Sequence, residues 1–270
     1  VVSISLAQEN ATNAARNFSR MATYLRADFD PARMVLAESM ESEGATMAAL
    51  EVLEKIAPDS AYSWEARMQI SLHLSKLGRL DDAVVHFNKA VEIKPNYAEA
   101  HSNLGVVLQE LGMLEEARAS CQKAIGIKPD YVEAQCNLSL VLQELGLLDE
   151  AVANYRKALT IKPDVAEMYN NLGNALKELG KFDEAIASYH KALSIDPDYV
   201  KAYDNLGLAF LVLGRPEEGV ASYNQALKLT PDDEAYFPRH SFLGQPERHF
   251  WMMATIVLLQ KLHRPIKMLE

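Results

Sequence analysis

The sequence predicts an all-α fold in which antiparallel helix pairs stack into a solenoid, and three observations support this prediction. A glycine recurs every 34 residues, at Gly44, Gly78, Gly112, Gly146, Gly180 and Gly214. A proline recurs with the same spacing, at Pro95, Pro129, Pro163, Pro197 and Pro231. Between these marks, each unit holds two helix-length segments with apolar residues at helical spacing. Such a repeat is typical of a solenoid, because one unit alone cannot bury its apolar face.

Each unit is therefore predicted to be a helix, a tight turn, a second helix and a break. Glycine suits the turn because it adopts the left-handed conformation at a helix end, and asparagine is the next best residue there. Asn10 stands one period before Gly44, in agreement with this interpretation. Proline suits the break because it cannot continue a helix.

The two helices of a unit are expected to cross closely where small residues recur, and large side chains are expected to fill the seams. The small residues are Gly105, Ser139, Gly173 and Gly207 on the first helix and Ala83, Ala117, Ala151 and Ala185 on the second. The large residues are Leu104, Leu138, Leu172, Leu206, Phe87, Tyr155, Tyr189 and Tyr223.

The segment YNNLGNALKELGKFDEAIASYHKALSIDPD, from Tyr169 to Asp198, closely resembles the tetratricopeptide repeat. The resemblance implies a right-handed superhelical solenoid whose first helices line a concave face. Its phase gives a partial repeat over 1–29 and six full repeats over 30–63, 64–97, 98–131, 132–165, 166–199 and 200–233. The first two units fit less well, because Ala27 replaces a proline and Pro58 comes three residues early, so helix boundaries around 50–64 are less well defined.

A row of carboxamides lies in phase on the first helices, at Asn103, Asn137, Asn171 and Asn205. The row resembles the asparagine ladder in the repeat arm of O-linked N-acetylglucosamine transferase, which implies contact with the backbone of an extended peptide. A carboxamide offers one acceptor and two donors, so it can pair with a peptide's N–H and C=O whatever the side chain. The alternative is that these amides only bond to adjacent helices.

In-phase glutamates at Glu99, Glu133 and Glu167 are predicted to make the concave face acidic and to favour a polar or basic partner. The alternative is that they form an ordinary solvated face. Asn174 and Lys201 resemble two elements of the dicarboxylate clamp found in some tetratricopeptide proteins, and Asn174 is counted with the partner-binding residues. A complete clamp is not expected, because Ser102, Cys136 and Asn170 stand where a lysine is wanted.

Several function classes are disfavoured. A net charge of -10 argues against binding to nucleic acid or to an anionic membrane. Two cysteines cannot form a disulfide framework, which favours a reducing, cytoplasmic location. The seven histidines show no metal-ligand spacing, and the sequence has no phosphate-binding glycine loop and no serine elbow. We therefore predict no catalytic residue, no metal and no cofactor, and no enzymatic activity for this chain alone.

The period is lost after Pro231, and residues 234–270 are predicted to be a linker followed by an apolar helix that caps the last repeat. The final residues RPIKMLE resemble the lead into the first strand of class I S-adenosylmethionine-dependent methyltransferases. This resemblance implies that the chain ends at the edge of a further, C-terminal domain.

Together these patterns predict a protein–protein interaction module, a scaffold that receives an extended peptide or partner segment along its concave face. One alternative is a substrate-recruiting arm of a methyltransferase or glycosyltransferase whose catalytic domain is absent. Another is a self-assembling scaffold that forms a homo-oligomer through the ends of the solenoid.

Overall fold

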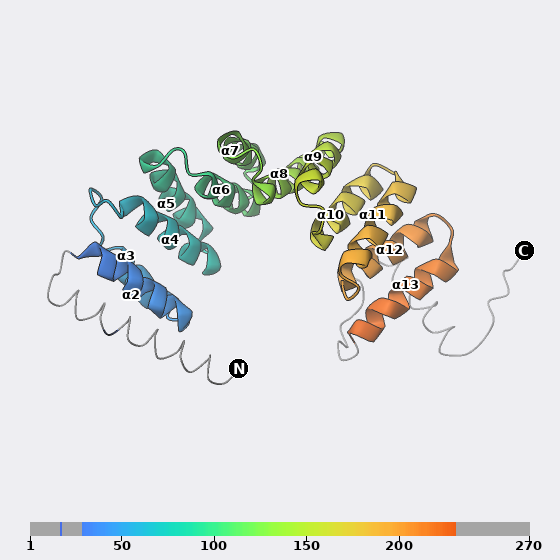
Figure 1. Cartoon of the computed structure of the whole chain (residues 1–270), viewed down its shortest axis with the longest axis horizontal. Helices are drawn as coiled ribbons and strands as arrows, with labels where there is room; N and C mark the ends of the chain where they lie inside the picture. Colours follow the sequence, from blue (N-terminus) through green and yellow to red (C-terminus); the bar gives the residue numbers. More distant parts are fainter. Residues whose placement is uncertain (1–16, 18–28, 231–270) are drawn as a thin grey trace, which may run out of the picture. The chain divides into compact units, whose positions relative to one another are not determined.

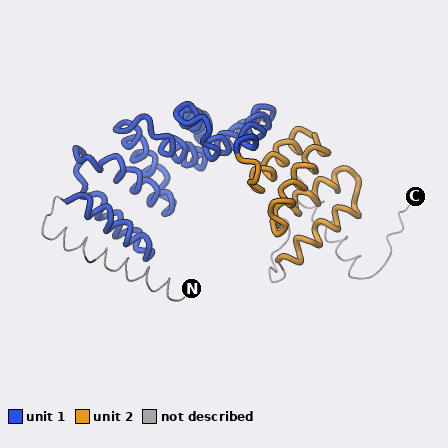
Figure 2. The backbone as a smooth tube through the Cα atoms, in the orientation of Figure 1, with its two compact units in different colours: residues 1–161 blue, residues 162–270 orange. Residues whose placement is uncertain are grey.

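The computed structural model describes Asn17 and residues 29–230, and the segment 29–230 contains α-helices and no strands, as predicted (Figure 1). Its helices are α2 (Asp30–Ser42), α3 (Thr46–Leu53), α4 (Ser63–Lys76), α5 (Leu80–Ile93), α6 (Ala98–Glu110), α7 (Leu114–Ile127), α8 (Val132–Glu144), α9 (Leu148–Ile161), α10 (Ala166–Glu178), α11 (Phe182–Ile195), α12 (Val200–Val212) and α13 (Pro216–Leu229). They belong to two compact units, residues 1–161 and 162–270, which are coloured separately in Figure 2.

Glycine ends each first helix, as the sequence predicts. All six glycines of the 34-residue series have a left-handed backbone, with φ between 72° and 75°. In the turn after α6, the N–H of Gly112 donates to the carbonyl of Gln109 and the N–H of Met113 donates to that of Leu108, both at 2.9 Å. These two bonds satisfy helix-end carbonyls that have no partner within the helix.

The second helices end shortly before the recurring prolines. Helices α5, α7, α9 and α11 end at Ile93, Ile127, Ile161 and Ile195, each two residues before a proline. Because proline lacks the N–H that would continue the hydrogen-bond ladder, the chain leaves the helix there and begins the next repeat.

Within a repeat, the two helices cross where the first carries a small residue and the second an alanine. Ala83, Ala117, Ala151 and Ala185 are all 0% exposed. A Cβ added to Gly173 would lie 2.5 Å from Cε1 of Tyr189, and one added to Gly207 would lie 2.7 Å from Cε2 of Tyr223. The predicted close crossings and the large seam residues are confirmed, and the aromatic ring of the second helix lies directly over the glycine of the first.

Within each compact unit, the contacts between neighbouring repeats involve the first helix of the later repeat. The second helix of one repeat packs against the first helix of the next, in the pairs α5–α6, α7–α8 and α11–α12. In addition α6 contacts α8 and α10 contacts α12, whereas successive second helices of the described repeats make no comparable contact. In the first unit, α6 and α8 therefore lie on the inner side of the row and α7 and α9 on the outer side (Figure 1).

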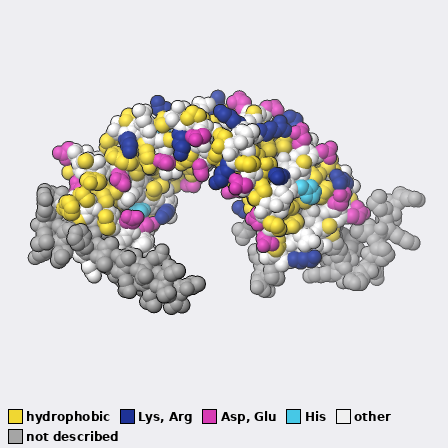
Figure 3. All heavy atoms as spheres, viewed as in Figure 1, with side chains coloured by type: hydrophobic (Ala, Val, Ile, Leu, Met, Phe, Trp, Pro, Cys, Tyr) yellow, Lys and Arg dark blue, Asp and Glu magenta, His cyan; other side chains and the backbone are white. Residues whose placement is uncertain are grey.

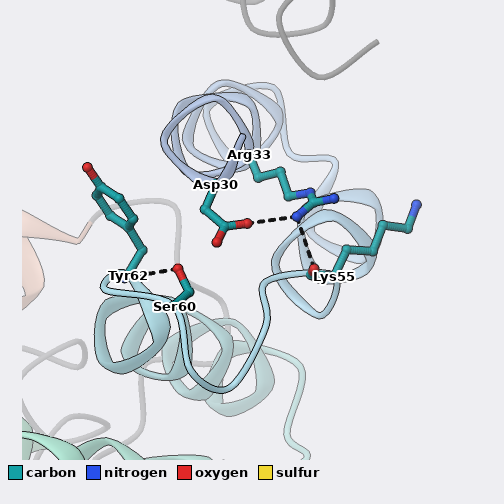
Figure 4. A network of polar contacts seen from close by, with 5 residues as sticks. All are labelled: Asp30, Arg33, Lys55, Ser60 and Tyr62. Carbon is teal, nitrogen blue, oxygen red and sulfur yellow. Dashed lines mark hydrogen bonds and ion pairs between the residues drawn. The ribbon is translucent and has the colours of Figure 1, made fainter. Parts of the chain in front are cut away.

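The first described repeat departs from the others after its short second helix. Helix α3 has 8 residues, whereas α5, α7, α9, α11 and α13 have 14. Lys55 lies just beyond the end of α3, and its carbonyl accepts a hydrogen bond from Nη1 of Arg33 at 3.1 Å. The same Nη1 donates to Oδ1 of Asp30 at 2.7 Å (Figure 4). The backbone N–H of Tyr62 donates to Oγ of Ser60 at 3.2 Å, just before α4 begins. Side chains here satisfy backbone groups of the segment that replaces the missing helical turns.

Two predicted segments fall outside the described residues: almost all of the partial repeat 1–29 and the linker with its capping helix over 234–270. Among the helices that the structure describes, none has both the length and the apolar content of a membrane span.

The crossing at Gly173 can be tested by Gly173→Ala. The added methyl group must displace the ring of Tyr189, and we expect a loss of about 1–3 kcal/mol in the free energy of unfolding, measured by urea denaturation. Gly126→Ala is the matched control, because a Cβ at Gly126, on helix α7, meets no atom within 4 Å. The control should keep or raise the stability by up to about 1 kcal/mol. Equal stability of the two variants would contradict the tight crossing.

Candidate functional site on the first helices

The predicted carboxamide row lies on four first helices, with Asn103 on α6, Asn137 on α8, Asn171 on α10 and Asn205 on α12. The four side chains are not equivalent. Asn205 is buried, with 6% of its surface exposed, whereas the other three are partly exposed. Asn103 and Asn137 belong to the first compact unit, and Asn171 and Asn205 to the second.

Polar side chains of adjacent first helices are joined by a contact that recurs with a fixed register. Nδ2 of Asn137 donates to Oγ of Ser102 at 3.1 Å in the first unit. Nδ2 of Asn205 donates to Oδ1 of Asn170 at 2.9 Å in the second. Both bonds join residues 35 apart, which is one repeat plus one residue. The same separation joins Gln109 to Glu144 at 2.6 Å and pairs Lys76 with Glu41.

This register explains why the asparagines differ. The residue 35 positions before Asn137 is a serine and the one before Asn205 is an asparagine, so both amides find a partner. The residue 35 positions before Asn103 is Met68, which is buried and offers no hydrogen-bonding oxygen or nitrogen. Within the described residues, the Asn103 side chain accordingly makes no hydrogen bond. For Asn137 and Asn205, bonding to an adjacent helix, the alternative stated from the sequence, is what the structure contains.

In the second unit a buried lysine joins this polar network. Lys177 on α10 is 6% exposed, and its Nζ lies 3.4 Å from Oδ1 of Asn174 and 3.4 Å from Oδ1 of Asn205. The hydroxyl of Tyr189 donates to Oδ1 of Asn174 at 2.9 Å. Burial lowers the pKa of Lys177 to about 8, because the charged ammonium loses its water. The oxygen of Asn174 is thus engaged inside the protein, and only its N–H groups remain to contact a partner.

Sequence reasoning missed Lys177. The available signal was its position one turn after Asn174, where the equivalent residues of other repeats are Gln109, Gln143 and Leu211. The sequence alone does not show that Lys177 is buried rather than solvated, because its burial depends on contacts with the neighbouring helix.

The predicted glutamates lie in the first turns of α6, α8 and α10, with Glu99 partly exposed and Glu133 and Glu167 exposed. A carboxylate at this position is stabilised by the partial positive charge of the helix N-terminus, whatever else it does. Burial and the adjacent carboxylate of Glu99 raise the pKa of Tyr97 to about 12. On the face that Figure 3 shows, acidic and basic side chains are interspersed over the described repeats, without a continuous basic surface.

The thiols and other potential ligands form no reactive centre in the part of the chain that the structure describes. Cys121 is buried, and burial raises the pKa of its thiol to about 12, so it stays protonated at neutral pH. Cys136 lies on the next helix and is partly buried. No group of three or more His, Cys, Asp or Glu residues is arranged to hold a metal ion among residues 29–230.

Family models decide the identity of the repeat. Models of the tetratricopeptide repeat match residues 98–131 and 200–233, and a further TPR-repeat model matches 74–112, 141–180 and 173–214. Together these matches cover more than half of the sequence. The chain is a tetratricopeptide-repeat protein.

Solved structures of other tetratricopeptide-repeat proteins share this fold. A crystal structure of MamA is 26% identical with a TM-score of 0.56, and the alignment covers 62% of this chain and 98% of MamA. TTC0263, a thermophilic TPR protein from Thermus thermophilus, is 25% identical with a TM-score of 0.53, covering 63% and 93%. YrrB, described as a TPR protein with an unusual peptide-binding site, is 22% identical with a TM-score of 0.53, covering 70% and 94%. No curated protein sequence matches the chain.

Replacing the asparagines one at a time separates those that tie helices from those that do not. Asn205→Ala removes the partner of Asn170, which is 3% exposed, and should lower the free energy of unfolding by about 1–3 kcal/mol. Asn103→Ala removes no bond and should change stability by less than about 0.5 kcal/mol. Chemical denaturation measures both. A larger loss for Asn103→Ala than for Asn205→Ala would contradict the assignment.

The buried lysine predicts a pH dependence. Its folded pKa of about 8 lies below the ordinary 10.5, so between these values the unfolded chain binds more protons and stability rises with pH. Lys177→Met should be more stable than the parent by about 1–3 kcal/mol at pH 7, and the difference should shrink as the pH rises from about 8 to 10.5. Lys191→Met, on an exposed residue of α11, is the control and should show no such trend. A pH-independent difference for Lys177→Met would refute the burial of a charged ammonium.

Proposed function

We propose that this chain is a protein-interaction scaffold that binds an extended segment of a partner protein along the first helices of its repeats. The observation that carries the proposal is the half-buried carboxamide of Asn103, which has no hydrogen-bond partner among the described residues; the residue 35 positions before it, Met68, has no side-chain group that could supply one. A polar group in such a place gains free energy when a ligand supplies the missing donors and acceptors.

The partner's backbone is the part of the ligand that a carboxamide fits best. Its N–H and C=O groups pair with the oxygen and the N–H groups of an asparagine side chain, independent of the partner's sequence. Asn103 has both available, and Asn137 keeps its oxygen and one N–H after bonding to Ser102. In the second unit, Asn171 and the N–H groups of Asn174 provide the equivalent contacts. Asn205 acts indirectly, because it is buried and holds α12 against α10.

Charge narrows the class of partner. Glu99 and Glu133 on the first unit and Glu167 on the second present carboxylates at the starts of first helices, and the whole chain carries a net charge of -10. Such a surface steers basic segments toward it and repels acidic ones. The partner segment is therefore polar or basic. The peptide-binding site described for YrrB, a protein of the same fold, agrees with this proposal.

The proposal favours neither the arm of a larger modifying enzyme nor a self-assembling scaffold, since each of these depends on parts beyond residues 29–230. A cytoplasmic location, the lack of a cofactor and the lack of enzymatic activity stay predictions from the sequence.

A selection from random displayed peptides on the full chain tests the proposal. We expect retained peptides to be enriched in Lys and Arg and to bind with a dissociation constant measurable by calorimetry. Asn103→Ala should weaken binding by about 2- to 12-fold, the equivalent of one hydrogen bond, without changing the melting temperature. Asn88→Ala, on the exposed face of α5, is the matched control and should leave binding unaltered. Failure to retain any peptide, or equal binding by both variants, would refute the proposal.

A further inference from the structure

Two aromatic side chains of one repeat enclose an ammonium group. Trp64 lies in the first turn of α4, and Tyr97 is the last residue of the same repeat. Their ring centroids are 5.0 Å apart and their planes are inclined by 68°. Nζ of Lys94 lies over both rings, 3.6 Å from the centroid of Trp64 and 4.8 Å from that of Tyr97. Trp64 and Tyr97 thus form a two-walled aromatic cage with a cation in it.

The aromatic cage is a particular feature of this repeat, and the repeat pattern alone does not produce it. The sequence Lys-Pro-x-Tyr occurs at 94–97 and again at 128–131, where Nζ of Lys128 lies 5.0 Å from the ring centroid of Tyr131. There the second wall is missing, because the residue equivalent to Trp64 is Ala98. In the next three described repeats the equivalent residues are Val132, Ala166 and Val200.

Carboxylates surround the aromatic cage. Glu65 follows Trp64 directly, and Glu99 lies two residues after Tyr97. Both carboxylates act on the hydroxyl of Tyr97 electrostatically. The site therefore combines two π faces, which attract cations, with two negative charges against the single positive charge of Lys94. This balance favours a cation.

Lys94 is held in a way that permits it to leave. It is exposed, it lies at the C-cap of α5 rather than inside the helix, and its ammonium forms no ion pair within the described residues. Its flexible stem of four carbons can turn the ammonium into solvent without unfolding any helix. A cation brought by a partner can then take the same place over Trp64 and Tyr97.

We propose that the aromatic cage is a binding site for the alkylammonium group of a partner's lysine side chain, methylated or not, and that Lys94 fills the cage in the absence of the partner. The inference deepens the proposed function and rests on it, because it names the side chain that the acidic first-helix surface recognises. Lys94 competes with the incoming lysine and so lowers its affinity for the aromatic cage. A partner therefore binds only if it also makes favourable contacts with the surrounding acidic surface.

The test uses small cations, which have no peptide backbone. In the full chain with Trp251→Phe, Trp64 is the single tryptophan, since the sequence has two. Its fluorescence is followed while butylammonium or butyltrimethylammonium chloride is added at constant ionic strength, with neutral 3,3-dimethylbutanol as the uncharged probe. We expect saturable binding of the cations, about 3- to 10-fold tighter after Lys94→Ala, and none of the alcohol. The tighter cation identifies unmodified or methylated lysine as the ligand.

Two further variants keep the test decisive. Lys128→Ala removes the cation from the single-walled position and should leave binding at Trp64 unchanged, and Tyr97→Leu should weaken it by about 3-fold or more. Unchanged affinity after Lys94→Ala, or equal binding of the neutral alcohol, would overturn the proposal. If peptides still bind the chain and Asn103→Ala still weakens them, the proposed peptide binding along the first helices is supported. Only the proposed lysine site in the aromatic cage is then refuted.

Discussion

The close crossing of the two helices within each repeat is the constraint on which the other features of the structure depend. At Gly173 and Gly207 the aromatic ring of the second helix lies where a Cβ would otherwise stand, and the alanines opposite are fully buried. A hairpin packed so closely has one apolar side left, which only another hairpin can cover. The recurring glycine and proline turn the chain at the same two points in every repeat, so that each hairpin packs on the preceding one in the same orientation.

Stacking of these hairpins fixes the register between adjacent first helices. This register determines which polar side chains form hydrogen bonds to the neighbouring first helix. Asn137 and Asn205 each donate to the residue 35 positions earlier, a serine and an asparagine, and so hold adjacent first helices together. Asn103, which follows Met68 by the same 35 residues, makes no side-chain hydrogen bond within the described residues. A single substitution on the neighbouring helix can therefore change whether an asparagine is hydrogen-bonded, without altering the repeat itself.

Much of the fold could be predicted from the sequence, because its signals are local or strictly periodic. The left-handed glycines, the proline breaks and the buried alanines and aromatics all belong to this class. The polar face could not be predicted equally well. An alignment at 34 residues places Asn103 and Asn205 in one row, whereas their environments are set by pairs 35 apart, which the alignment does not display.

Residues that are unique to one repeat were the hardest to interpret from sequence. Lys177 contacts Asn205 of α12, and Trp64 contacts the ammonium group of Lys94, 30 residues later in the sequence. The shortening of α3 was signalled by the early Pro58, but the bond from Arg33 to the carbonyl of Lys55 was not. In each case the deciding contact joins residues that are distant in sequence and follow no period.

The most direct test of this account is a double-mutant cycle on Ser102 and Asn137, the pair that the register brings together. Ser102→Ala, Asn137→Ala and the double variant are compared by chemical denaturation in the full chain. We expect a coupling free energy of about 0.5–1.5 kcal/mol, because each substitution removes the same hydrogen bond. Additive effects, with a coupling free energy indistinguishable from zero, would contradict the claim that the helix register decides which asparagines are tied to the scaffold.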